Sequence, residues 1–120
     1  MRMKKVPVEW STYVKRLDAA QQKALLDTMD IALNMVNEPE CVMSYGVPTI
    51  TSNKRYIIAA GAYKNFISLY PFGNEAIMAN AELFANNATS KGAVRFTYEQ
   101  LPTRQHIKEI ITYNSNKYKR

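Results

Sequence analysis

The clearest hydrophobic pattern in the chain runs from Tyr56 to Tyr70, with the sequence YIIAAGAYKNFISLY. Two runs rich in β-branched and aromatic residues flank the polar pair Lys64-Asn65. Such runs favour strands, and a polar pair containing Asn between them is typical of a tight hairpin turn. In the segment from Phe66 to Tyr70, apolar or aromatic side chains fall on both faces of the strand. We therefore expect a hairpin whose second strand is central in a sheet or borders an aromatic-lined cleft.

Two amphipathic segments precede this hairpin. The first is short, and the residues that share its apolar helical face are Trp10, Tyr13, Val14 and Leu17. Asp18 followed by Gln21 matches a capping box and predicts the start of a second helix. This helix should end before Asn37-Glu38-Pro39, because a residue that precedes proline disfavours the α conformation. Its buried stripe is expected to contain Leu25, Leu26, Met29, Ala32, Leu33 and Val36.

The other segments predict an α+β fold, a small and mostly antiparallel sheet packed against N- and C-terminal helices. Further strands are expected at 41–45, 49–51 and 93–98, with turns or loops at 46–48, 52–55 and 86–92. Asn74 predicts a helix that reaches about residue 86, and Pro102 opens a last helix that carries Ile107, Ile110 and Ile111. With 120 residues and 47% hydrophobic content, the chain is expected to form a single domain over 1–120.

Charge is unevenly distributed along the chain. The net charge is +6, and basic residues concentrate in 1–23 and 104–120, whereas 24–53 contains no Lys or Arg. Basic termini are typical of solubilising tails, so the acidic stretch between them is the more informative feature. Its carboxylates are Asp27, Asp30, Glu38 and Glu40. We expect Asp27 and Asp30, three positions apart, on the solvent face of their helix.

Several classes of protein are not expected. No apolar run approaches the roughly 20 residues of a membrane span, and the first ten residues lack the apolar core of a signal peptide. We therefore expect a soluble, cytoplasmic protein without a membrane partner. Cys41 has no disulfide partner, and with His106 as the single histidine it cannot form a cysteine-based zinc site. Nucleophile-elbow, phosphate-loop, dinucleotide-binding and zinc-protease motifs do not occur, so we expect no enzyme and interpret His106 as a surface residue.

Three segments carry a family resemblance. They are SYGVP at 44–48, AAGAYKNFISLYP at 59–71 and TSKGAVRF at 89–96, followed by Leu101-Pro102. In order and spacing they resemble the small bacterial YdhG-like family, mostly filed as a domain of unknown function. The resemblance covers nearly the whole chain and implies an α/β sandwich of antiparallel sheet and terminal helices. Some members are described as frataxin-like intracellular iron chaperones, and members often carry histidine where this chain has Phe66.

That resemblance makes iron a hypothesis for the acidic stretch. Iron that is bound weakly and passed on to a client protein suits exposed, hard oxygen ligands rather than a rigid cage. The carboxylates available for such a site are Asp27, Asp30, Glu38 and Glu40. The alternative is that these acids only keep the helix face soluble and offset the basic termini. None of the four matches a family ligand motif, so their nomination comes from the residues alone.

A small-anion or metabolite site is the alternative function. The loop before Arg95 offers hydroxyls, backbone donors freed by a glycine, and positive charge, which together can hold a phosphate or carboxylate. The residues expected to form such a site are Lys64, Tyr70, Ser90, Lys91, Gly92 and Arg95. Tyr45 and Tyr63 could line a pocket beside Tyr70. A purely structural turn with cross-strand tyrosine pairs explains the same residues.

Nucleic acid is not an expected partner. The C-terminal segment YNSNKYKR combines basic residues with Tyr113 and Tyr118, which could contact a phosphate backbone and stack on a base. The basic residues are dispersed along the chain and match no recognised binding motif. A solvated terminal helix explains them equally well, and the sequence does not define the oligomeric state.

Overall fold

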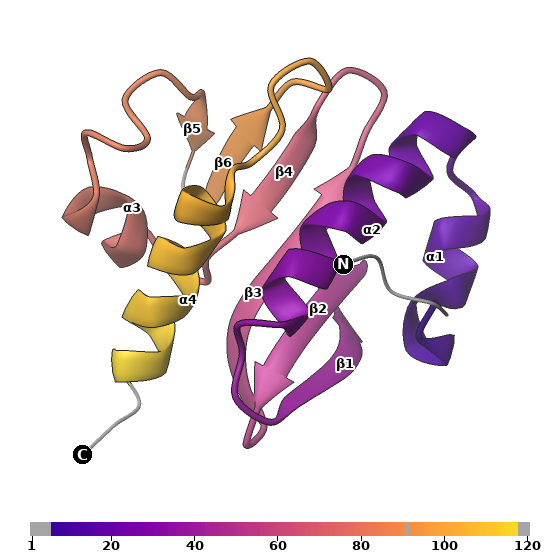
Figure 1. The fold of residues 1–120 in the computed structure, drawn as a ribbon, viewed down its shortest axis with the longest axis horizontal. Helices are drawn as coiled ribbons and strands as arrows, with labels where there is room; N and C mark the ends of the chain where they lie inside the picture. Colours follow the sequence, from indigo (N-terminus) through magenta and orange to yellow (C-terminus); the bar gives the residue numbers. More distant parts are fainter. Residues whose placement is uncertain (1–5, 91, 118–120) are drawn as a thin grey trace.

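The computed structural model describes residues 6–90 and 92–117, and the elements in this part of the chain give the predicted α+β order. The helices are η1 (Val8–Trp10, a 3-10 turn), α1 (Ser11–Lys15), α2 (Ala19–Leu33), α3 (Glu75–Ala79) and α4 (Arg104–Lys117). The strands are β1 (Pro39–Ser44), β2 (Val47–Ser52), β3 (Arg55–Ala62), β4 (Ile67–Tyr70), β5 (Thr89–Ser90) and β6 (Ala93–Phe96). They form an antiparallel sheet in the order β1-β2-β3-β4-β6-β5, with α2 and α4 in front of it in Figure 1.

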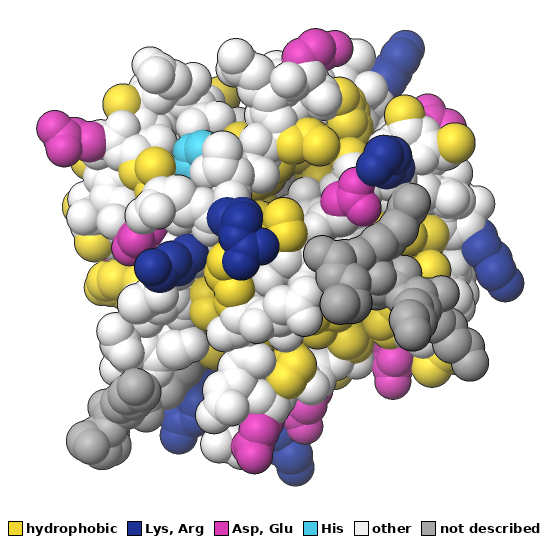
Figure 2. Space-filling view, viewed as in Figure 1, with side chains coloured by type: hydrophobic (Ala, Val, Ile, Leu, Met, Phe, Trp, Pro, Cys, Tyr) yellow, Lys and Arg dark blue, Asp and Glu magenta, His cyan; other side chains and the backbone are white. Residues whose placement is uncertain are grey.

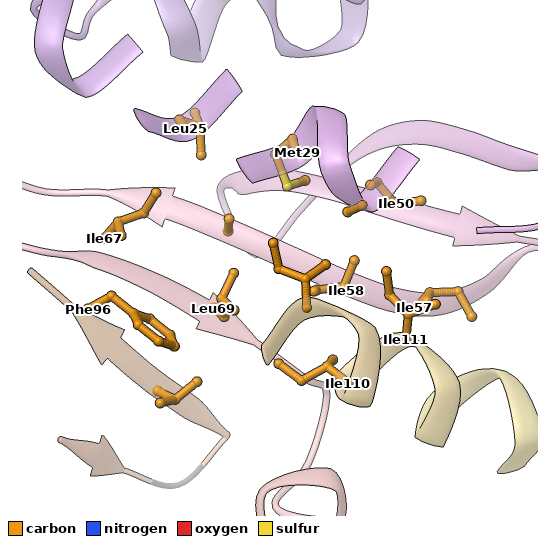
Figure 3. Close-up of a cluster of buried hydrophobic side chains, with 14 of the residues drawn as sticks. Leu25, Met29, Ile50, Ile57, Ile58, Ile67, Leu69, Phe96, Ile110 and Ile111 are labelled. Atoms are coloured by element: carbon orange, nitrogen blue, oxygen red, sulfur yellow. The ribbon is translucent and has the colours of Figure 1, made fainter. Parts of the chain in front are cut away.

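Helices α2 and α4 cover the same face of the sheet, since both contact β3 and each other. Leu25 and Met29 of α2 and Ile110 of α4 are fully buried there. Figure 3 shows them directed toward strand residues that include Ile58 and Leu69. Burying one such side chain stabilises the fold by about 1.5–3 kcal/mol. The apolar stripe predicted for the second helix is therefore the face that attaches α2 to the sheet.

The hairpin predicted over Tyr56 to Tyr70 is confirmed as β3 and β4. The amide of Tyr63 donates to the carbonyl of Phe66 (2.9 Å) and closes the turn at Lys64-Asn65. The turn from β2 to β3 is also confirmed and centres on Asn53-Lys54, with φ values of 53° and 64°. Positive φ at both central residues is what a type I′ hairpin turn requires.

The turn from β1 to β2 lies elsewhere than predicted. It is formed by Tyr45-Gly46, at φ values of 54° and 78°, and not by residues 46–48. Val47 and Pro48 pair with Ser44 and Met43 and so belong to β2. The left-handed conformation at Gly46 allows a two-residue turn, and the strand resumes directly after it.

A β-bulge in β3 decides which face each aromatic side chain of that strand occupies. Ile50 pairs with Ile58, but the next residue of β2, Thr51, pairs with Tyr56, so Ile57 is an extra residue. Ile57 and Ile58 both join the core under the helices. An extra residue shifts the alternation of side chains by one position. Tyr56 is thereby placed on the sheet face opposite to the helices.

The capping box predicted for α2 is present. The prediction for one carboxylate of this helix, Asp30, was wrong. The Gln21 amide donates to Asp18 Oδ1 (2.8 Å), and the Asp18 amide donates to Gln21 Oε1 (2.9 Å). Asp30 was expected on the solvent face and is only 8% exposed. Leu26 and Leu33, four positions before and three after it, pack against the core. Their spacing puts Asp30 at the border of the buried stripe.

Helix α3 is shorter than predicted, and Asn74 does not cap it through its side chain. This residue was expected to cap a helix that reaches about residue 86, but α3 ends at Ala79. The side chain of Asn74 makes no capping bond and instead accepts a hydrogen bond from the Gly92 amide (2.7 Å). At the other end of the helix, Asn80 leaves the helical conformation, with φ −125° and ψ 41°. The segment 80–86 forms turns.

In the part of the chain that the structure describes, no helix is long and apolar enough to cross a membrane. Figure 2 shows Lys, Arg, Asp and Glu side chains spread over the face that it views. The expectation that nucleic acid is not a partner stays a prediction.

Candidate ligand cavity

The sheet face opposite to α2 and α4 is called the open face below. The pairing register puts Thr49, Ala59 and Tyr70 side by side on this face, in β2, β3 and β4. A second row joins Gly61 of β3 to Ser68 of β4 and Arg95 of β6. Thr49 and Ala59 are nonetheless fully buried or nearly so. Side chains on the open face must therefore cover the strands themselves.

A cavity of about 290 Å³ lies on the open face. Its walls are Tyr45, Val47, Ala59, Tyr63, Tyr70 and Phe72. Ser44 and Gly92 complete the lining at the ends of β1 and of the loop before β6. The lining is mostly aromatic and aliphatic with a few hydroxyl groups, the composition that is typical of small-molecule sites.

The polar centre of the cavity wall is a pair of tyrosines. The hydroxyl oxygens of Tyr63 and Tyr70 are 2.6 Å apart, so one donates a hydrogen bond to the other. Tyr63 reaches this position because Gly61 has no side chain: a Cβ there would lie 2.7 Å from the Tyr63 hydroxyl. Burial, and then the hydrogen bond with Tyr70, raise the pKa of Tyr63 above its ordinary value of 10.0. Tyr63 is therefore uncharged at neutral pH.

The backbone and ring of Tyr63 are held from several sides. Its carbonyl accepts hydrogen bonds from Tyr98 Oη (2.5 Å) and from Gln21 Nε2 of α2 (3.2 Å). Its ring stacks on Phe66, with centroids 5.0 Å apart. The guanidinium carbon of Arg95 lies 4.3 Å from the centroid of the Phe66 ring. These contacts fix the tyrosine pair before any ligand arrives, which lowers the entropic cost of binding.

Three further aromatic rings form a cluster, and two of them, Tyr45 and Phe72, line the cavity. Tyr56 and Phe72 are stacked at 4.9 Å, and the ring of Tyr45 lies 6.4 Å from the first and 6.3 Å from the second. Tyr45 and Phe72 both have positive φ, 54° and 55°. For bulky residues this conformation is unusual and is often found at functional positions. The β3 bulge supplies Tyr56 to the same cluster.

The structure brings together only part of the residues predicted to bind an anion. Tyr70 and Gly92 line the cavity, as do Tyr45 and Tyr63, the tyrosines that the sequence indicated for a pocket. Lys64 is exposed in the hairpin turn, Ser90 is exposed in β5, and Arg95 stacks on Phe66; none of the three lines the cavity. Lys91 lies outside the described residues.

The sequence did not indicate Phe72, Val47 or Ala59 as cavity residues. Phe72 stands before a glycine, and Tyr45 likewise stands before Gly46. An aromatic residue before glycine could have suggested a turn that holds its ring outward. Val47 and Ala59 carry no comparable signal, because any small or aliphatic residue suits a strand position.

The four carboxylates proposed for iron do not converge. Asp27 pairs with Lys23 at 2.7 Å, Asp30 is buried, and Glu40 Oε1 accepts hydrogen bonds from Thr51 Oγ1 and the Lys54 amide. Glu38 is exposed. Within residues 6–90 and 92–117, no group of three or more His, Cys, Asp or Glu side chains could hold a metal ion. Iron binding stays a prediction without a common site in this part of the chain.

His106 is not the surface residue that was expected. Its Nδ1 accepts from the Thr103 amide (3.0 Å), and its own amide donates to Thr103 Oγ1 (3.2 Å), a reciprocal cap at the start of α4. The ring packs against Phe84 and Phe96, with centroids 5.3 and 4.9 Å away. Burial lowers the pKa of His106 below its ordinary value of 6.5, although the Leu83 backbone opposes this shift. The role of the histidine is thus explained by helix capping and packing.

Fold and cavity together define a class: small α+β proteins whose antiparallel sheet is covered by helices on one face and carries an aromatic cavity on the other. No family model matches the sequence, and no curated protein matches it. Among solved structures, YdhG of Bacillus subtilis, a protein of the DUF1801 family, matches with a TM-score of 0.83. The match covers 91% of this chain and 90% of that one, at 13% sequence identity.

The fold implied by the resemblance at 44–48, 59–71 and 89–96 is therefore confirmed as that of YdhG. The match concerns the arrangement of the backbone and carries no activity with it. It gives no support to the frataxin-like or iron-chaperone part of the resemblance. Any function has to be argued from the side chains of this chain.

Proposed function

We propose that this chain is a non-enzymatic, YdhG-like binding protein that holds a small and largely apolar molecule in the open-face cavity. One observation carries the proposal: a hydrogen-bonded pair of tyrosines, Tyr63 and Tyr70, in the wall of a mostly apolar cavity. Ligand sites commonly combine apolar walls with a few fixed polar groups that orient the ligand. Here the aromatic walls supply contact area, and the hydroxyl groups of the tyrosine pair orient the ligand.

The size of the cavity limits the ligand. An apolar cavity of about 150 Å³ is enough to bind benzene, and drug-sized ligands occupy roughly 300–1,000 Å³. A volume of about 290 Å³ therefore suits one ring with a small substituent. A nucleotide or a peptide would extend beyond it.

The chemistry of the lining favours a neutral ligand over a small anion. No Lys, Arg, Asp or Glu is found among the described lining residues. An isolated charge in such surroundings is strongly disfavoured unless it is paired. Tyr63 is a poor general base, because its raised pKa keeps the phenol protonated. These properties support binding without catalysis.

The proposal is tested by titrating small neutral aromatic compounds into ¹⁵N-labelled protein and following the amide signals of the chain. We expect shifts confined to the cavity strands, and their loss in Ala59→Leu, because a larger side chain at this floor position fills the cavity. Ala85→Leu, at an exposed position outside the cavity, is the matched control. Shifts that persist unchanged in Ala59→Leu would place the ligand elsewhere and refute the proposal.

A further inference from the structure

Tyr45 lies in the turn that precedes β2 and borders the cavity. Its backbone belongs to the turn before Val47, at the start of β2, but its ring contacts Tyr56, which pairs with Thr51 near the end of that strand. Tyr45 also lines the cavity together with Ala59. The rings of Tyr45 and Tyr56 therefore meet on the open face, where Tyr45 borders the cavity.

The ring of Tyr45 is held by weak contacts. Tyr45 is 85% exposed and meets Tyr56 and Phe72 through edge and tilted ring contacts. Ring pairs of this kind contribute only about 0.5–1.5 kcal/mol beyond buried area. No hydrogen bond of its hydroxyl occurs within the described part of the chain. Tyr45 can therefore move aside and return without disturbing the sheet.

The tyrosine pair defines what a ligand must offer. Two phenols carry two hydroxyl protons, and one proton is used in the bond between Tyr63 and Tyr70. Among the described residues, no group outside this pair accepts the other proton. This proton is therefore free to be donated to a ligand. Tyr63 keeps its hydroxyl proton at neutral pH, because burial raises its pKa. A matching ligand needs one hydrogen-bond acceptor next to an apolar body.

On the basis of the proposed function, we propose that the ligand is an uncharged, planar aromatic compound with a single carbonyl-type acceptor. Its acceptor takes the free proton of the Tyr63–Tyr70 pair, and its ring packs against Phe72 under Tyr45. Planarity follows from the stacked and edge-on rings around the cavity. The absence of charge follows from the described lining residues, among which there is no Lys, Arg, Asp or Glu.

Four compounds of similar size test this assignment: acetophenone, ethylbenzene, benzoate and phenyltrimethylammonium. Their dissociation constants are measured by the same amide titration on the full chain. We expect acetophenone to bind about five-fold more tightly than ethylbenzene, the usual worth of one added hydrogen bond. The two charged compounds should bind more weakly than acetophenone.

Matched variants identify the groups responsible. In the double variant Tyr63→Phe, Tyr70→Phe, acetophenone and ethylbenzene should bind with equal affinity, whereas Tyr113→Phe, a tyrosine of α4 outside the cavity, should leave their difference intact. Tyr45→Ala should raise the dissociation rate of acetophenone. If ethylbenzene or either charged compound binds as tightly as acetophenone, the ligand class is wrong while the proposed function stands. If none of the four compounds shifts the amide signals of the cavity residues, both the ligand class and the proposed function are wrong.

Discussion

The hydroxyl of Tyr63 lies 2.6 Å from that of Tyr70, although the first residue follows β3 and the second ends β4. The Tyr63 ring folds back over Gly61, the strand position where no side chain obstructs it. Both rings then border the same cavity. The hairpin thus forms both the centre of the sheet and the polar part of the candidate site.

Gly61→Ala should separate the tyrosine pair. The new Cβ would lie 2.7 Å from the Tyr63 hydroxyl and 3.0 Å from two of its ring carbons, so the ring must turn away. We expect an altered near-UV circular dichroism spectrum and about five-fold weaker binding of acetophenone, from the loss of one hydrogen bond. A spectrum and affinity equal to those of the wild type would show that the contact with Gly61 does not position Tyr63.

Asn114→Ala should destabilise the fold. The buried side-chain nitrogen of Asn114 donates to the carbonyls of Ile57 (2.7 Å) and Pro71 (2.8 Å), and so joins α4 to the bulge and to the end of β4. Leaving a buried acceptor unpaired costs about 1–3 kcal/mol. Urea denaturation should show a loss of at least about 2 kcal/mol, against little change for the exposed Asn116→Ala. Equal stability of the two variants would contradict this role.

His106 should make stability depend on pH. Its pKa is lowered in the folded chain by burial, so the unfolded chain, with a pKa near 6.5, binds more protons. The stabilising contribution is complete above about pH 6.5 and is lost as the pH falls toward the folded pKa. Protonation at Nδ1 would also remove the acceptor for the Thr103 amide.

Urea denaturation between pH 4.5 and 7.5 measures this effect. His106→Gln is the matched variant, because glutamine at this position can complete the same reciprocal cap without titrating. We expect the wild type to lose more stability than His106→Gln as the pH falls below 6.5. Parallel pH profiles for the two proteins would show that the histidine is not responsible.

The iron hypothesis can be tested on the carboxylates themselves. Because Asp27, Asp30, Glu38 and Glu40 do not form a common group, their combined replacement by amides should change Fe(II) binding little in anaerobic calorimetry. A stoichiometric Fe(II) site in the wild type that disappears in this variant would contradict the structural account and support the iron hypothesis.

Local patterns predicted the hairpin, the α2 capping box and the apolar stripe, because each depends on residues close together in sequence. The place of Tyr56 could not be predicted in this way. It depends on the bulge, which is defined by pairing with β2. The contact of the Asn74 side chain could not be predicted either, since its partner Gly92 lies in a loop that is distant in sequence.

In the candidate site, too, some features could be predicted from residue type, whereas others depend on contacts between distant segments. Tyr70, Gly92 and the tyrosines beside them were indicated by residue type, and the structure places them around one cavity. Arg95 and Lys64 were grouped with them because of charge, but the fold holds the first on Phe66 and the second in an exposed turn. Residue chemistry alone does not determine which side chains share a cavity.

The most direct test of the cavity as a ligand site is the set of intermolecular nuclear Overhauser effects between acetophenone and the methyl groups of the protein. The account predicts contacts from the ligand ring to the methyls of Ala59 and Val47, which line the cavity. Contacts confined to methyl groups outside the cavity, such as those of the buried Ile110 in α4, would contradict it.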